Sequence, residues 1–216
     1  MQGKKTKKIE SISPDIFAIS KTQQVQGNRR LVREKVLQIL FAQNYCDTSL
    51  NDLFDHIFFR IFKFDIDDEA KIEINAILKP EEIQEIEADI PIHWKSSELE
   101  FGRELIAKTK DNQDQCDELI SKFSKNWEFD RIALVDKIIM RIAIAEFLYF
   151  PQIPLKVTIN EALELAKSYS TYNSSFFING ILDAAKSELL QNNLIYKDSK
   201  GLIENNQEKK LKDEIS

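Results

Sequence analysis

The chain has 216 residues, of which 43% are hydrophobic, and it carries a net charge of −6 with a pI near 5.2. This hydrophobic fraction excludes a disordered chain. The net negative charge excludes a protein that binds polyanions, such as nucleic acids, through its whole surface. The two cysteines, Cys46 and Cys116, lie far apart, and no CxxC or CxH spacing exists, so the sequence does not predict a structural zinc site. Because Gly and Pro number only 5 each, long helices are favoured over many short strands.

Targeting and catalytic signals are missing from the sequence. No apolar run reaches the roughly 18 residues of a transmembrane helix, and residues 1–19 carry lysines without the apolar stretch of a secretory signal. We therefore expect a cytoplasmic protein that does not enter a membrane. Motifs such as GxGxxG, GxxxxGK[ST], GxSxG and HExxH are absent. The sequence accordingly predicts neither an enzyme nor a bound cofactor.

The N-terminal quarter divides into an arm and a helix. Residues 1–27 mix lysines with Ser, Gln and Pro at little periodicity, which predicts a flexible arm. Asn28 can cap a helix that runs to about Tyr45. One face of this helix repeats apolar residues at the spacing of a core stripe: Val32, Val36, Ile39 and Leu40.

Basic residues crowd the first two turns of that helix: Arg29, Arg30, Arg33 and Lys35. At 100° per residue, Arg30, Glu34, Leu37 and Phe41 share a second face, outside the apolar stripe. Arginine binds phosphates and stacks on bases, and an exposed ring can stack on a base or anchor a partner protein. The residues alone leave two interpretations open, an RNA-binding surface or a solvated charged face with a buried Phe41.

Further helices are predicted downstream of the first. A Phe-rich helix spans 50–64, the acidic segment 65–94 is ambiguous apart from a short helix after Pro80, and two helices span 97–109 and 113–125. Residues 130–150 are apolar nearly all round, which is typical of a central helix packed on several sides. Pro151 and Pro154 end this helix.

The last helices follow from local signals. Thr158-Ile-Asn-Glu161 has the pattern of a capping box, which predicts a helix from there to about Tyr169. After a polar loop at 170–174, Asn173 or Ser174 caps a helix that continues to about Leu190. Because Phe177, Ile181, Ala185 and Leu189 keep four-residue steps, we expect Gly180 to lie inside this helix at a close helix–helix contact. Residues 193–216 are predicted to be a disordered charged tail, which leaves 28–192 as one helical domain.

The loop before the last helix is a second candidate binding site. It carries hydroxyls, an amide and aromatic rings between Tyr169 and Phe177. A helix N-terminus binds phosphate through its backbone N–H groups, and Tyr and Asn add stacking and hydrogen bonds. The alternative is an ordinary capped loop with Phe177 in the core.

Several strings of the second half resemble the NusB transcription antitermination family. They are WEFDR at 127–131, DKIIMRIAIAE at 136–146, IPLKVTINEALELAK at 153–167 and FINGILD at 177–183. The first helix, from Arg29 to Phe41, looks like the arginine-rich opening of that family. The resemblance covers about residues 28–45 and 98–190.

This resemblance implies an all-α fold of two packed three-helix bundles with a central apolar helix. It implies binding of the single-stranded boxA element of ribosomal RNA leaders, together with the ribosomal protein that serves as the antitermination factor NusE. The pair would act on the RNA polymerase elongation complex with other Nus factors, and a homodimer is a further possibility. The rival interpretation is a helical protein-interaction module, either a homodimer or a ribosomal-protein binder, that does not bind RNA.

The family's functional positions can be carried over to this chain. RNA-binding positions fall on the basic cluster of the first helix and on the loop before the last one: Arg29, Arg30, Arg33, Lys35, Asn173 and Phe177. The protein-partner surface falls on Phe41 and Asp136. The family often has Tyr at position 41, so a hydroxyl contact is lost here. It often has an acid at position 173, where an amide repels phosphate less.

Overall fold

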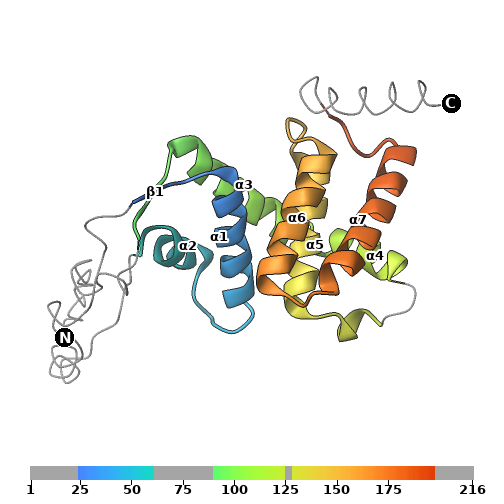
Figure 1. Cartoon of the computed structure of the whole chain (residues 1–216), viewed down its shortest axis with the longest axis horizontal. Helices are drawn as coiled ribbons and strands as arrows, with labels where there is room; N and C mark the ends of the chain where they lie inside the picture. The colour runs from blue at the N-terminus through green and yellow to red at the C-terminus, as the bar shows by residue number, and fades with distance from the viewer. Residues whose placement is uncertain (1–23, 61–89, 125–127, 198–216) are drawn as a thin grey trace, which may run out of the picture.

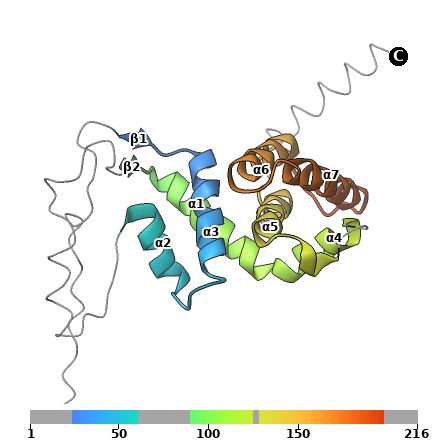
Figure 2. The same cartoon turned by 60° about the horizontal axis from the view of Figure 1, so that its bottom comes forward.

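A computed structural model describes residues 24–60, 90–124 and 128–197. These ranges hold seven α-helices, one short 3-10 helix and a parallel pair of two-residue strands. Figures 1 and 2 show two groups of helices side by side, with α1, α2 and α3 in one and α4 to α7 in the other. The predicted all-α fold is confirmed, and among the described residues no helix is long and apolar enough to cross a membrane.

The first group is built around α1, which spans Arg29–Ala42 and packs against α2 (Leu50–Phe59), α3 (Ser96–Asp111) and α5 (Leu134–Tyr149). The predicted N-cap is confirmed, because the Asn28 side-chain oxygen accepts a hydrogen bond from the Leu31 backbone N–H at 3.0 Å. The predicted core stripe is buried as well: Val32, Val36, Ile39 and Leu40.

Two boundaries in the first group differ from the sequence prediction. Residues 25–26, placed in the arm, form strand β1 (Val25–Gln26), which pairs in parallel with β2 (Ile92–His93). Helix α2 ends at Phe59 because Arg60 takes a left-handed conformation with φ of 58°. The short helix predicted after Pro80 and most of the arm lie outside the described residues.

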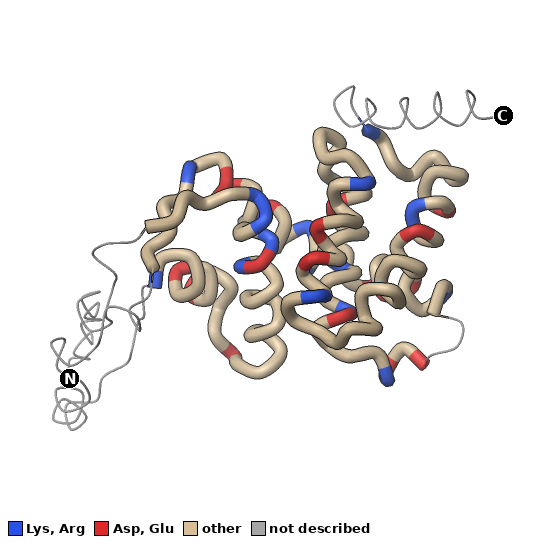
Figure 3. The backbone as a smooth tube through the Cα atoms, in the orientation of Figure 1, with Lys and Arg blue, Asp and Glu red and all other residues tan. Residues whose placement is uncertain are grey.

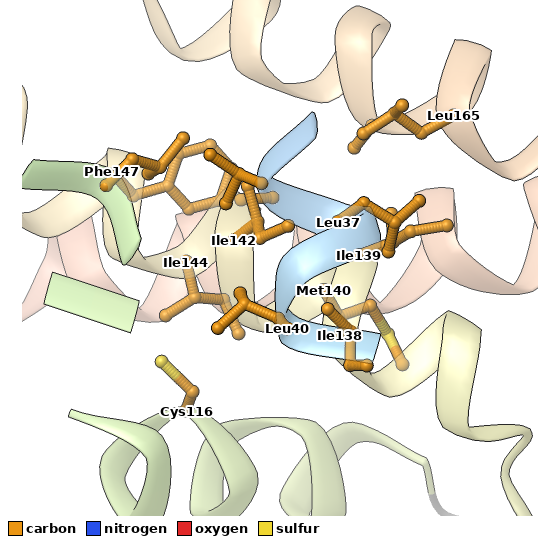
Figure 4. Packing of buried hydrophobic residues seen from close by; sticks show 14 of the residues in the cluster. Leu37, Leu40, Cys116, Ile138, Ile139, Met140, Ile142, Ile144, Phe147 and Leu165 are labelled. Atoms are coloured by element: carbon orange, nitrogen blue, oxygen red, sulfur yellow. The ribbon is translucent and has the colours of Figure 1, made fainter. Parts of the chain in front are cut away.

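The second group is centred on α5, as its all-round apolar sequence predicts. Helix α5 contacts α1 and α3 of the first group, and α4 (Gln113–Phe123), α6 (Leu155–Tyr169) and α7 (Ser174–Gln191) of its own. A short 3-10 helix, η5 (Phe129–Arg131), precedes it. Figure 4 shows side chains of α5 between Leu37 and Leu40 of α1, Cys116 of α4 and Leu165 of α6. The core therefore runs through both groups.

The predicted start of α6 is wrong. The helix begins at Leu155, directly after Pro154 at the N-cap position, so Thr158 and Glu161 lie inside it. The Thr158 hydroxyl donates to Glu146 at 2.8 Å, and Glu161 pairs with Arg30. The residues that resemble a capping box thus make tertiary contacts, and a proline with a fixed φ supplies the helix start instead.

The predicted role of Gly180 is also wrong, although α7 does continue through it. A Cβ added at Gly180 would meet nothing within 4 Å, and the residue is exposed. The helix buries the neighbouring positions Ile181, Leu182 and Ala185 instead. Gly180 is therefore on the solvent face and not at a helix–helix contact.

The chain beyond α7 returns to the core for a short distance. Residues 193–197, assigned to the disordered tail from sequence, are described, and Lys197 is buried. Its Nζ donates to the backbone carbonyls of Glu146 and Phe150 at 3.2 and 2.9 Å. A cation at the C-terminal end of α5 also complements the helix dipole. Residues 198–216 lie outside the described part.

Candidate nucleic-acid interface

The arginines at the start of α1 separate into two exposed residues and one buried residue. Arg33 is only 4% exposed, and its guanidinium donates to the Glu146 carboxylate through Nε at 2.5 Å and Nη2 at 3.0 Å. A third bond joins Nη1 to the backbone carbonyl of Arg29 at 3.2 Å. The assignment of Arg33 to RNA is therefore corrected: its donors are engaged inside the protein, where Glu146 compensates the buried charge.

The spacing of Arg33 holds a signal of this burial. Leu37 and Leu40 follow it at four and seven residues, which is the periodicity of a single helix face, and both are buried. Arg33 therefore belongs to the inward face of α1. Arg29 and Arg30, one turn earlier, lie at its exposed edge.

Arg29 lies over an aromatic ring. Its guanidinium carbon is 4.0 Å from the centroid of the Phe101 ring on α3, which is a cation–π contact. Burial against this ring lowers the pKa of Arg29, and the nearby charge of Arg33 lowers it further. Because arginine stays charged at neutral pH even so, Arg29 presents an oriented cation at the surface.

Arg30 points across to α6 and forms a two-pronged ion pair. Its Nε and Nη2 atoms donate to the Glu161 carboxylate at 3.1 and 3.0 Å. The hydrogen bond to Glu161 and the charge of that carboxylate raise the pKa of Arg30. The side chain is 59% exposed, and the pair uses only part of its five N–H donors. Figure 3 shows the basic first turns of α1 with the acidic residues of α6 across from them.

A tyrosine connects α1 to the loop of the second candidate site. Tyr169, the last residue of α6, donates its hydroxyl to Glu34 at 2.6 Å and accepts from Gln38 at 3.1 Å. Burial, followed by the hydrogen bond to Glu34, raises the pKa of Tyr169 to about 12. Lys35, half-buried, donates to Gln38 at 3.1 Å. The polar side of α1 thus runs directly into the loop at 170–173, a link that the sequence prediction missed.

The loop exposes more aromatic surface than the sequence prediction assigned to it. Asn173 is exposed at the N-cap position of α7, where its side chain makes no capping hydrogen bond, and Phe177 is half-buried against the core. Tyr172 is 82% and Phe176 is 66% exposed, and their rings meet edge to face with centroids 5.7 Å apart. Because Phe176 and Phe177 are consecutive in a helix, their side chains point about 100° apart, and only Phe177 can reach the core.

The two residues predicted for the protein partner differ in exposure. Phe41, near the end of α1, is 37% exposed and tilts against the exposed ring of Tyr45 at 5.2 Å. Asp136, in the first turn of α5, is only 6% exposed. One of its oxygens, Oδ2, accepts from the Ser174 hydroxyl at 2.9 Å.

Asp136 also lines a pocket at the head of α7. This pocket has a volume of about 250 Å³ and is lined by residues that precede or begin α5 and by the loop with the first turn of α7: Arg131, Ile132, Ala133, Asp136, Thr171, Asn173, Ser174 and Phe177. The structure thus brings Asp136 next to Asn173 and Phe177, although the sequence assigned them to different partners.

Comparison with known proteins identifies a family that the chain matches. A family model described as the NusB family matches residues 55–187. Proteins named transcription antitermination protein NusB are similar along most of the chain. The protein of Chloroherpeton thalassium is 35% identical over 177 residues, which is 82% of this chain and 70% of that protein. The protein of Bacillus subtilis is 34% identical over 163 residues, which is 76% of this chain and 98% of that protein.

Solved structures agree with the sequence relatives. A crystal form of NusB from T. maritima superimposes with a TM-score of 0.55 at 29% identity, over 76% of this chain and 94% of that one. NusB from Aquifex aeolicus, at 18% identity and a TM-score of 0.51, covers 79% of this chain and 95% of its own, and supports the fold alone. Because the family model spans more than half of the sequence and the relatives match most of it, the chain belongs to the NusB family.

Proposed function

We propose that this protein is a transcription antitermination factor that binds boxA-type single-stranded RNA of ribosomal RNA leaders together with the ribosomal protein NusE. In the cytoplasm it would act on the RNA polymerase elongation complex with other Nus factors. One observation carries the proposal: exposed arginines at the head of α1 share a continuous polar surface with the aromatic loop before α7. A solved complex of NusB and NusE with double-stranded RNA has this fold, with a TM-score of 0.52 at 16% identity.

The RNA surface would bind phosphates through charged residues and bases through aromatic stacking. Arg29 and Arg30 supply cations for phosphates, and each keeps an exposed guanidinium. The loop supplies a neutral amide at Asn173 and exposed rings at Tyr172 and Phe176, which suit unstacked bases of a single strand. Lys35 lies between these two parts as a further cation.

The protein-partner surface would centre on Phe41 and Asp136. Phe41 and Tyr45 form an exposed aromatic pair at the end of α1, which is the kind of residue that anchors protein interfaces. Arg30 and Phe41 are eleven residues apart, so the RNA end and the protein end of α1 lie roughly 16 Å apart along the helix axis. This distance allows both ligands to bind at once.

The second candidate function is a protein-interaction module, including a homodimer, that does not bind RNA. The ion pair between Arg30 and Glu161 favours this alternative, because a phosphate must compete there with a carboxylate that is already in place. The exposed aromatic pairs at Phe41 and Tyr172 would then serve protein contacts only.

A binding titration separates the two functions. A fluorescent boxA-type RNA is titrated with the protein, with and without NusE, at two salt concentrations. The double variant Arg29→Ala/Arg30→Ala should weaken binding and lower the salt slope by about 1.4, since each phosphate contact on a single strand contributes about 0.7. The matched control, Lys110→Ala/Lys186→Ala, removes the same charge from other helices and should keep the wild-type slope. Absence of RNA binding by the wild type, with NusE present, refutes the proposal in favour of the interaction module.

A further inference from the structure

We propose that a small polar pocket at the junction of the two groups of helices binds an acidic side chain of the protein partner, through an unused edge of the Arg141 guanidinium. The inference rests on the proposed function and deepens it, because it names the chemical group that NusE presents beside Phe41. The occupant is a single carboxylate, and the pocket takes no part in RNA binding.

The pocket lies where the first group of helices meets the second. It has a volume of about 50 Å³, and its polar lining comes from four helices or their ends: Gln43 and Asn44 after α1, Thr109 of α3, Gln113 of α4 and Arg141 of α5. A volume of about 10–15 Å³ admits one water, so the pocket has room for roughly three to five heavy atoms. That is enough for a carboxylate and too little for a nucleobase.

Arg141 is a largely buried cation with only one edge paired. Its Nε and Nη2 atoms donate to the Asp117 carboxylate at 2.6 and 2.8 Å, and the side chain is 11% exposed. The third nitrogen, Nη1, makes no hydrogen bond within the described ranges and keeps solvent-accessible surface. Because a guanidinium carries five N–H donors in one plane, Nη1 and the second proton of Nη2 form a free edge that matches another carboxylate.

Two side-chain amides extend this set of donors. Gln43 and Gln113 make no side-chain hydrogen bond in the described part of the chain, so their N–H groups are available to an acceptor. Thr109 and Asn44 instead donate to backbone carbonyls four residues earlier, at 2.7 Å each. No acidic side chain of the described residues lines the pocket. The unused polar groups are therefore mainly donors around a cation, and such a set selects an anion.

The position of the pocket on α1 indicates that the anion belongs to the protein partner. Gln43 lies between the two exposed rings of the proposed partner surface, Phe41 and Tyr45. It is fourteen residues beyond Arg29, which puts the pocket roughly 21 Å along the helix axis from the RNA end. A partner that packs against the two rings can therefore place a neighbouring carboxylate in the pocket. Such a charge adds specificity to an aromatic contact.

The experiment measures binding of purified NusE to Gln113→Glu by calorimetry. The new carboxylate competes for the free edge of Arg141 and repels the carboxylate of the partner. Gln113 is the first residue of α4, where a negative charge suits the helix dipole, so the variant should fold as the wild type does. Gln115→Glu is the matched control, because it is the same change at an exposed position of the same helix that does not line the pocket.

Gln113→Glu should weaken NusE binding by about tenfold or more, because like charges that meet in an interface are strongly unfavourable. Gln115→Glu should stay within about twofold of the wild type, as expected for an isolated surface charge. Both variants should bind boxA-type RNA without NusE as tightly as the wild type does.

A double-mutant cycle then identifies the carboxylate. Each Asp and Glu of NusE is replaced in turn by its amide, and the loss of affinity is compared between the wild type and Gln113→Glu. One replacement should weaken binding to the wild type and cause little or no further loss in Gln113→Glu, because the two changes affect the same contact. All other replacements should add to the effect of Gln113→Glu within about twofold.

Wild-type NusE affinity in Gln113→Glu, or additive effects at every acidic position of NusE, overturns the inference. An equal loss of RNA affinity without NusE also overturns it, because the pocket then binds a phosphate. If the wild type itself binds no NusE, the proposed function fails at its partner, and the carboxylate assignment fails with it.

Discussion

Arg33 of α1 and Glu146 of α5 form a fully buried ion pair, 5% and 0% exposed at the side chains, that joins the two groups of helices. Two hydrogen bonds connect them, and the Thr158 hydroxyl of α6 adds a third to Glu146. One carboxylate thus holds three helices that are distant in sequence. One of the basic residues at the start of α1, Arg33, therefore stabilises the fold. The proposed RNA surface depends on this ion pair because Arg29 and Arg30 extend from the same turn.

Arg33→Ala should destabilise the protein by about 3–5 kcal/mol, because it leaves the Glu146 charge buried without compensation. Urea unfolding followed by circular dichroism measures the change. Arg30→Ala is the control, since its ion pair is exposed and should change the unfolding midpoint little. A variant at Arg33 that keeps wild-type stability but loses RNA affinity would restore the assignment made from sequence.

Gly180 faces solvent inside α7. Gly180→Ala should stabilise the protein by about 0.5–1 kcal/mol, because alanine restricts the unfolded chain and meets no atom in the folded one. Thermal unfolding measures the gain. The control is Gly102→Ala on α3, where a Cβ would lie 3.1 Å from Phe58 and 3.2 Å from Val32, so it should not share the gain. Destabilisation by Gly180→Ala contradicts the open environment.

Some of these relationships were accessible from sequence because they are local. The Asn28 cap, the apolar stripe of α1 and the all-round apolarity of α5 depend on spacings within one helix, and each is confirmed. The resemblance to the NusB family added the two-group arrangement. Helix propensity and hydrophobic pattern therefore predicted where the helices lie. The way in which the helices pack together was predicted from the family resemblance.

Several errors concern residues whose partners lie far away in sequence. Thr158 and Glu161 satisfy a local capping pattern, yet their hydrogen bonds go to α5 and α1. Arg33 is a charge whose counter-charge lies 113 residues later, so composition suggested an exposed cation. Asp136 and Ser174 are 38 residues apart, and nothing local indicates that they share a hydrogen bond. The only sign in the sequence that Arg33 is buried was its position seven residues before Leu40, on the same helix face.

Tyr169 should make the stability of the protein dependent on alkaline pH. Its pKa is raised from 10.0 to about 12, so the folded state holds the phenol proton more tightly than the unfolded chain does. This contribution is fully present below pH 10 and is lost as the pH rises towards 12. Tyr169→Phe should be less stable than wild type at pH 8, and the difference should shrink between pH 10 and 12. Paired chemical unfolding curves check this, and a constant difference contradicts the raised pKa of Tyr169.

Phe41 should matter for NusE and not for RNA alone. Phe41→Ala should weaken NusE binding by about 1–2 kcal/mol, or roughly 5- to 30-fold, as expected for an exposed aromatic anchor. Calorimetry with purified NusE measures the change, and RNA affinity without NusE should stay the same. Leu190→Ala, at another exposed apolar position near the end of α7, is the control. Equal losses in both variants contradict a specific surface at Phe41.

Phe176 should discriminate between RNA stacking and protein contact at the loop before α7. A base stacked on its ring contributes about 1–3 kcal/mol, so Phe176→Ala should weaken boxA-type RNA binding by roughly 5- to 150-fold. Phe176→Tyr keeps a stacking ring and should retain most of the affinity. If the edge-to-face pair with Tyr172 instead covers a homodimer interface, Phe176→Ala should leave RNA affinity unchanged and shift the sedimentation of the free protein towards the monomer. Because the ring is 66% exposed, neither result can be explained by loss of core packing.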